Sequence, residues 1–200
     1  MTRQFQAILN PISGRRNMLP VVRRIQSLLG RAGAQLEIAV TEHAGHASEI
    51  AAQTDHQVEA VLVGGGDGGA CEVINGLADR RLPLAILRTG TENLLARELG
   101  MPVDPERVAE TLLHGRCFLG DLGLINNRIR FLAVAGVGFD AECVLRMTQV
   151  RRGHITHGDY FWPIWRTFWA HRFPELDIQV DGDRIFAGRG FAIIGVIPRY

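Results

Sequence analysis

The sequence contains no lysine, because all 22 of its basic residues are arginine. A phosphate-binding loop of the Walker type needs a lysine, and so does a Schiff-base mechanism, so both are excluded. Phosphate must instead be held by backbone N–H groups, by arginine or by a metal ion. The net charge of +1 lacks the basic excess typical of nucleic-acid binding, so we expect no nucleic-acid partner.

Cysteines and long apolar runs are also scarce. The three cysteines, Cys71, Cys117 and Cys143, lie far apart and provide neither a disulfide framework nor paired metal ligands. The first residues lack the apolar region of a signal peptide, and no stretch is long and apolar enough to span a bilayer. We therefore expect a cytoplasmic protein with no transmembrane segment, attached to a membrane at most peripherally.

Strand and helix patterns alternate in the first half of the chain. The strand patterns cover Phe5–Leu9, Leu36–Val40, Val58–Val63 and Leu82–Leu87. This alternation predicts an α/β fold with a doubly wound parallel sheet. From about Phe118 hairpin patterns take over, with turns at Asn126-Asn127 and Asp181-Gly182. We predict one α/β domain over residues 1–117 and an incomplete, β-rich second domain over residues 118–200.

The run Val61–Gly69 reads as a buried strand followed by a glycine-rich turn and a helix. Such a turn lets backbone N–H groups approach a phosphate chain, with a helix N-terminus directed at the negative charge. Asp67 lies among the glycines, where a carboxylate suits phosphates only if it binds a metal or takes a proton. The run therefore predicts phosphoryl chemistry on a nucleotide. As a loop residue, Asp67 is expected to contribute little to fold stability.

Polar or glycine-rich turns follow all four predicted strands: Asn10–Gly14, Thr41, Gly64–Gly69 and Thr89–Asn93. The carboxyl ends of parallel strands share one edge of a sheet, so these turns predict a single ligand crevice. Gly64, Gly66 and Gly69 also match a loose dinucleotide fingerprint. That fingerprint belongs after the first strand, whereas this one follows the third, which argues against a dehydrogenase.

Two further patterns leave alternatives open. His43 and His46, like His154 and His157, are three residues apart but have no nearby third ligand, so we predict no metal site. Aromatic residues between Phe161 and Trp169 fall largely on one helical face. That face either packs in a core or meets an acyl chain or membrane interface. If left uncovered it would favour self-association, so a homodimer is one expectation.

Several motifs together resemble the diacylglycerol kinase catalytic domain, which sphingosine kinases and bacterial lipid kinases share. The strongest are Gly65-Gly-Asp-Gly68 and Glu72-Val-Ile-Asn-Gly-Leu77. The others, in matching order, are Asn10-Pro with Ser13-Gly14, Thr41 with Gly45-His46-Ala47, Gly90-Thr-Glu-Asn93 with Ala96-Arg97, Gly136–Ala141 and Ile197–Tyr200. The resemblance covers essentially the whole chain, and the ordered set is more specific than any one motif.

The resemblance implies an ATP-dependent, Mg²⁺-assisted kinase that phosphorylates the hydroxyl of diacylglycerol or a related lipid at a membrane surface. Residues 1–117 would then bind the nucleotide, and residues 118–200 would begin the lipid domain. Asp67 is the implied catalytic residue, either as proton acceptor or as organiser of magnesium. The implied nucleotide site comprises Asn10, Ser13, Thr41, Gly65, Gly66, Gly68, Glu72, Gly90 and Thr91.

The chain departs from the family pattern at four positions. Gly69 replaces a threonine, Cys71 an asparagine, Leu94 an aspartate and Arg88 a proline. Two alternatives follow: an NAD kinase-like enzyme, which also uses a Gly-Gly-Asp-Gly turn, or a nucleotide- or lipid-binding relative without catalysis. The family's chain continues beyond the Pro-Arg-Tyr region, so we expect this chain by itself to have little kinase activity.

Overall fold

The computed structural model describes residues 2–13, 17–78, 80–89, 93–150, 165, 167 and 173–196. They form two compact units, one extending to Ala133 and the other beginning at Val134. We describe each unit by itself. The domain boundary near residue 118 remains a prediction.

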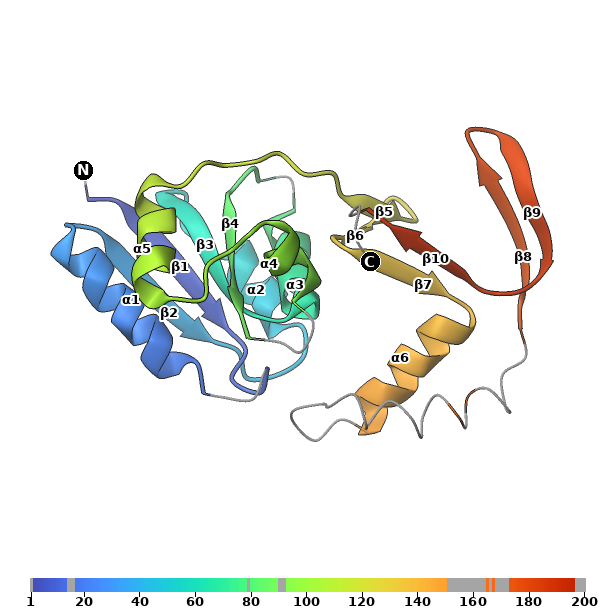
Figure 1. Ribbon diagram of the computed structural model, residues 1–200, viewed down its shortest axis with the longest axis horizontal. Coiled ribbons are helices and arrows are strands. Elements are labelled where there is room, and N and C mark those ends of the chain that lie inside the picture. The colour runs from blue at the N-terminus through green and yellow to red at the C-terminus, as the bar shows by residue number, and fades with distance from the viewer. Residues whose placement is uncertain are drawn as a thin grey trace. The chain divides into compact units, whose positions relative to one another are not determined.

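The first unit is built on a four-stranded parallel sheet, drawn from blue to green in Figure 1. Its strands are β1 (Gln4–Leu9), β2 (Gln35–Val40), β3 (Val58–Gly65) and β4 (Leu84–Arg88), in the spatial order β2-β1-β3-β4. All three pairings are parallel. The four predicted strands are therefore confirmed, with their ends shifted by up to two residues.

Helices cover both faces of this sheet, so the predicted doubly wound arrangement is confirmed. They are α1 (Leu19–Arg31), α2 (His46–Ala52), α3 (Asp67–Leu77), α4 (Leu94–Glu98) and α5 (Pro105–His114). α1 packs with α5, while α2 packs with α3 on the opposite side of the strands (Figure 1). Right-handed crossovers require this division, because the chain moves one way from β1 to β2 and the other way from β2 to β3 and β4.

The core lies between the sheet and these helices. The central strands β1 and β3 carry almost continuous apolar runs, which is typical of parallel strands covered on both faces. Phe5, Ile8 and Leu62 are almost completely buried, and Val22 and Ile25 of α1 pack at helical spacing. Each such side chain stabilises the fold by about 1.5–3 kcal/mol. The core therefore holds the strand ends in fixed positions.

A predicted hairpin follows the α/β part of the first unit. Strands β5 (Gly123–Ile125) and β6 (Ile129–Phe131) pair antiparallel, and the turn residues Asn126 and Asn127 both have positive φ. The hairpin is joined to α3 through Asn75. The Asn75 side-chain amide donates to the Arg130 carbonyl at 2.8 Å and accepts the Arg130 N–H at 2.9 Å.

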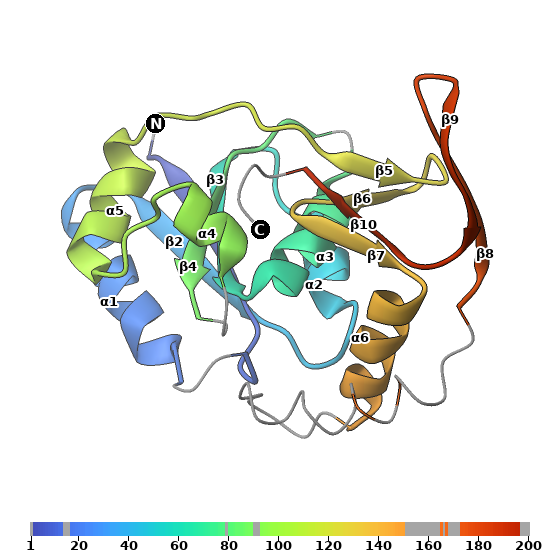
Figure 2. The same cartoon turned by 45° about the vertical axis from the view of Figure 1, so that its right-hand side comes forward.

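The second unit contains α6 (Phe139–Val150) and two small antiparallel sheets (Figure 2). One sheet pairs β7 (Val134–Val137) with β10 (Ala192–Gly195), and the other pairs β8 (Glu175–Val180) with β9 (Asp183–Arg189). The β-rich pattern after Phe118 is thus confirmed. Of the predicted aromatic face only Trp165 lies among the described residues, and it is exposed. Within the described ranges no helix is long and apolar enough to cross a membrane.

Candidate active site

The carboxyl ends of the four strands lie at one edge of the sheet, and the direction in which strands are added reverses between β1 and β3. Open α/β sheets bind ligands at such a point, outside the carboxyl ends of the strands. Asn10 follows β1, Thr41 follows β2, Gly66 follows β3 and Thr89 follows β4. The Asn10 N–H donates to the Gly64 carbonyl at 2.8 Å, so the turns after β1 and β3 lie side by side.

Hydroxyl groups join the turn after β1 to the turn after β4. The Ser13 hydroxyl lies 2.9 Å from the Asn10 carbonyl, to which it donates, and 3.2 Å from the Thr89 hydroxyl. Ser13 and Thr89 are both buried. The structure thus brings the predicted residues Asn10 and Ser13 together with Thr89, which the sequence analysis did not select. Its position directly after a strand, like that of Thr41, is the signal that could have identified it.

The glycine-rich turn is shorter than predicted. β3 continues through Gly65 and α3 begins at Asp67, so Gly66 alone links strand to helix in an extended conformation. Gly64 and Gly65 belong to the strand because they pair with Leu87 and Arg88 of β4. A Cβ on Gly64 would lie 2.2 Å from Cδ2 of Leu9. The strand needs this glycine because the Leu9 side chain fills the space beside it.

The start of α3 has the features of an anion site. The N–H groups of Asp67, Gly68 and Gly69 have no acceptor among the described residues, as is usual for a first helical turn without a cap. A Cβ on Gly68 or Gly69 would meet no atom within 4 Å. Free N–H groups and open space therefore occur together at the positive end of a helix.

Asp67 has a structural role that its sequence position does not show. Its Oδ2 accepts the Leu94 N–H at 3.1 Å and its Oδ1 accepts the Leu95 N–H at 3.0 Å. The carboxylate therefore caps the first turn of α4. Our interpretation of Asp67 as a loop residue is wrong, because it begins α3. We now expect it to stabilise the fold, because its substitution would leave two helix N–H groups without their acceptor. Each oxygen keeps a further lone pair for a ligand.

Glu72 and Cys71 lie on α3 beyond the first turn. Glu72 is half-buried, and its carboxylate has no hydrogen-bond partner in the described part of the chain. Burial raises the pKa of the Cys71 thiol; a hydrogen bond with the Leu132 backbone lowers it, and the Asp67 charge raises it. Cys71 is therefore a protonated thiol at neutral pH, unsuited to nucleophilic catalysis.

Not every predicted residue can be placed. Gly90 and Thr91 lie outside the described residues. Thr41 is buried after β2, and its N–H donates to the Leu9 carbonyl at 2.8 Å. Asn10 and Ser13 thus lie in the turn after β1, and Thr41 lies at the end of β2. Gly65, Gly66, Asp67 and Gly68 span the end of β3 and the start of α3.

A histidine pair near Thr41 has a third potential ligand that the sequence analysis missed. Ligand atoms of His43, His46 and Glu49 lie within 4.8 Å of one another. The two imidazole rings, however, are stacked nearly parallel with their centroids 4.6 Å apart. His46 Nδ1 also accepts the Glu42 N–H at 3.0 Å, so its lone pair is already used. This geometry does not direct both rings at one cation.

The site fits a nucleotide phosphate more completely than it fits a magnesium ion. The open N–H groups of α3 provide donors for phosphate oxygens. For magnesium, which prefers oxygen ligands, the described residues offer the remaining lone pairs of Asp67 and the carboxylate of Glu72. These two residues are the candidates for holding the ion or its water molecules.

Comparison with known proteins gives consistent results. The chain is 28% identical over 190 residues to the diacylglycerol kinase of Bacillus subtilis (strain 168), a match that covers 93% of this chain and 62% of that protein. It is 30% identical over 194 residues to the diacylglycerol kinase of Staphylococcus carnosus (strain TM300), covering 94% of this chain and 62% of that protein. The chain thus spans about three-fifths of the length of these relatives.

A solved structure from Bacillus anthracis str. Sterne, assigned as a diacylglycerol kinase, is also similar. The TM-score is 0.69 at 25% sequence identity, and the match covers 96% of this chain and 65% of that one. Residues 4–125 match the diacylglycerol kinase catalytic domain. This stretch contains the whole parallel sheet and every predicted site residue. The chain belongs to the diacylglycerol kinase catalytic domain family.

Proposed function

We propose that this chain carries the nucleotide-binding part of an ATP-dependent lipid kinase, which transfers a phosphoryl group to the hydroxyl of diacylglycerol or a related lipid. The observation that carries the proposal is the start of α3, where free N–H groups and open space around Gly68 lie at the switch point of the sheet. Glycine costs a helix about 1 kcal/mol relative to alanine, and no neighbour here excludes a side chain. A ligand that approaches the backbone closely would explain why glycine occupies this exposed position.

In this proposal the first turn of α3 binds the phosphate groups of ATP. The lipid hydroxyl oxygen bonds to the terminal phosphorus, the bond from that phosphorus to the bridging oxygen breaks, and ADP leaves. The hydroxyl proton passes to Asp67 or to a water molecule that Asp67 orients. Either role uses the lone pairs that the Leu94 and Leu95 N–H groups leave free. Magnesium, when bound, neutralises phosphate charge during transfer.

The other site residues position the nucleotide. The Ser13–Thr89 hydrogen bond links the turns after β1 and β4, so that phosphate contacts from both turns keep a fixed geometry. We further propose that the protein is cytoplasmic and meets its lipid at a membrane surface. Thr41, Gly90 and Thr91 belong to the proposed site through the family pattern.

Turnover of ATP on a panel of lipids by the full product of the gene tests the function. We expect phosphorylation of a lipid hydroxyl that requires Mg²⁺. Phosphorylation of NAD instead would overturn the proposal in favour of the NAD kinase-like alternative. Titration of the 200-residue chain with ATP tests nucleotide binding separately from turnover, because this chain by itself is expected to have little activity. ATP binding without turnover by the full product of the gene would identify the non-catalytic relative that Gly69, Cys71 and Leu94 motivate.

A further inference from the structure

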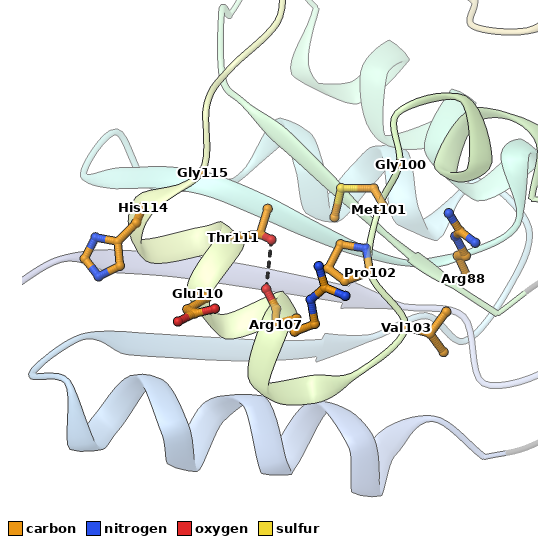
Figure 3. A pocket seen from close by; sticks show the side chains of 10 residues that line it. All are labelled: Arg88, Gly100, Met101, Pro102, Val103, Arg107, Glu110, Thr111, His114 and Gly115. Atoms are coloured by element: carbon orange, nitrogen blue, oxygen red, sulfur yellow. Dashed lines mark hydrogen bonds between the residues drawn. The ribbon is translucent and has the colours of Figure 1, made fainter.

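Arg88 and Thr89, at the end of β4, have different surroundings. Figure 3 shows Arg88 beside a hollow of about 580 Å³ that Arg107 of α5 also lines. Thr89 does not line this hollow, and its hydroxyl lies 3.2 Å from the Ser13 hydroxyl in the turn after β1. Successive side chains of a strand point to opposite faces, so the end of β4 presents Arg88 to the hollow and Thr89 to the turn after β1.

The direction of the hydrogen bond between Ser13 and Thr89 follows from the hydrogens available. A hydroxyl group has one hydrogen, and Ser13 donates its hydrogen to the Asn10 carbonyl at 2.9 Å. Thr89 is therefore the donor in its bond with Ser13. Because the hydrogens of both hydroxyls are used between Thr89, Ser13 and Asn10, neither remains for a phosphate oxygen. Ser13 thus contributes to the site through its position rather than as a donor to phosphate.

This bond is also the far attachment of the turn after β1. At the beginning of the turn, the Asn10 N–H donates to the Gly64 carbonyl at 2.8 Å. Within the turn, the Ile12 N–H donates to Asn10 Oδ1 at 3.1 Å and the Ser13 N–H donates to the Asn10 carbonyl at 3.2 Å. Among the described residues, Thr89 is the only hydrogen-bond partner of Ser13 outside this turn. The Thr89 hydroxyl therefore holds the end of the turn that Asn10 does not hold.

The attachment crosses the carboxyl end of β3, just before the open start of α3. β3 lies between β1 and β4 in the sheet, so a bond from the turn after β1 to Thr89 must pass the end of β3. Gly65 pairs with Arg88 at this end, and a Cβ on Gly65 would lie 4.0 Å from the Asn10 Cβ. The turn after β1 is thus held beside the glycines that precede the free N–H groups of α3.

We propose that Thr89 is a positioning residue for the nucleotide. Its buried hydroxyl holds the turn after β1 against the end of β3, so that this turn and the first turn of α3 form one phosphate-binding surface. A turn that is already held in place loses less conformational freedom when the nucleotide binds, which strengthens binding. The inference rests on the proposed function and adds to it a residue that the sequence analysis did not select.

ATP titration of matched variants of the 200-residue chain tests this role. Thr89→Val keeps the shape of the side chain but removes the hydroxyl, and should weaken ATP binding about fivefold. Thr89→Ser keeps the hydroxyl and should bind ATP within about twofold of wild type. Thr54→Val is the control, because it also removes a buried threonine hydroxyl, which donates to Gln6 Oε1 at 2.6 Å before the amino end of β3. It should lower the melting temperature and leave ATP affinity unchanged.

Two further measurements separate positioning from a general loss of stability. In a Ser13→Ala background, Thr89→Val should not weaken ATP binding further, because Thr89 acts through Ser13. Hydrogen–deuterium exchange without nucleotide should be faster at the N–H groups of Asn10 and Ser13 in Thr89→Val than in wild type. The same N–H groups should exchange at the wild-type rate in Thr54→Val.

Four results would overturn the inference. They are equal ATP affinity of wild type and Thr89→Val, an equal loss of affinity in Thr54→Val, additive losses in the double variant, and unchanged exchange in Thr89→Val. The exchange measurement needs no nucleotide, so unchanged exchange would overturn the role of Thr89 and leave the proposed function standing. Wild type that bound no ATP would overturn the proposed function, and the role of Thr89 in nucleotide binding with it.

Discussion

Two helices of the first unit begin near each other and differ in what their first N–H groups meet. At the start of α4 the N–H groups of Leu94 and Leu95 are bound by Asp67. At the start of α3 the N–H groups of Asp67, Gly68 and Gly69 have no acceptor among the described residues. The Asp67 carboxylate thus caps the start of α4, while Asp67 itself is the first residue of α3, whose own start is uncapped. The fold therefore satisfies α4 internally and leaves α3 available to an external anion.

Removing the shared carboxylate should have the largest effect. Asp67→Ala is expected to reduce lipid kinase turnover of the full gene product at least a thousandfold, since the proposed proton acceptor or magnesium organiser is lost. It should also lower the free energy of unfolding by about 2 kcal/mol, because α4 loses both hydrogen bonds to a half-buried carboxylate. Turnover assays and urea unfolding measure the two effects.

A second cap provides the control for the stability effect. Asp104 caps α5 with one hydrogen bond to the Arg107 N–H, so Asp104→Ala should cost about 1 kcal/mol and leave nucleotide binding unchanged. If Asp67→Ala proved as stable as wild type, the capping role of Asp67 would be wrong. If it kept full turnover, its catalytic role would be wrong.

Two glycines of α3 allow a matched comparison of its ends. A Cβ on Gly76 would lie 2.1 Å from the Ser48 carbonyl oxygen, because α2 and α3 approach closely there. Gly76→Ala should therefore destabilise the fold by about 3 kcal/mol. Gly68→Ala meets no neighbour and should stabilise it by about 0.5–1 kcal/mol, while weakening ATP binding about tenfold. Melting temperatures and ATP titrations measure these changes. Unchanged ATP affinity in Gly68→Ala would argue against phosphate binding at the α3 start.

The smallest effect is expected at Cys71. The reactivity of its thiol depends on the charge near the start of α3. A helix N-terminus usually lowers a thiol pKa, but burial and Asp67 raise the pKa of Cys71. Because only the thiolate reacts, iodoacetamide should modify Cys71 more slowly at pH 8 than the exposed Cys117. Asp67→Asn removes one cause of the raised pKa, so the reaction should become a few times faster. Mass spectrometry of the labelled peptides follows both rates, and an unchanged rate would show that the Asp67 charge does not raise this pKa.

The sheet could be predicted from the sequence because buried parallel strands carry apolar runs that few other structures tolerate. The cap on α5 could also be predicted from the sequence, because Asp104, Pro105 and Glu106 form a typical helix-start pattern. The length of the glycine-rich turn could not be predicted from the sequence. Gly64 and Gly65 look like loop residues in the sequence, but their pairing with Leu87 and Arg88 of β4 keeps them in β3.

The parts of the site that the sequence did not predict depend on tertiary contacts. Asp67 reaches N–H groups at Leu94 and Leu95, far along the chain, and no local pattern encodes that contact. The approach of Glu49 to His43 and His46 requires the turn of α2. Arg88 was recognised as a departure from the family pattern, but the hollow that it shares with Arg107 exists only after α5 has folded against the sheet.

The side-chain amide of Asn75 in α3 forms two hydrogen bonds with the backbone of Arg130 in β6, in the way that a residue of a neighbouring strand would. α3 cannot turn about its axis or slide along it without breaking both bonds, so the β5–β6 hairpin is anchored to the last turn of the helix. The helix that begins beside the strand-end turns is therefore fixed near its last turn by an element outside the parallel sheet.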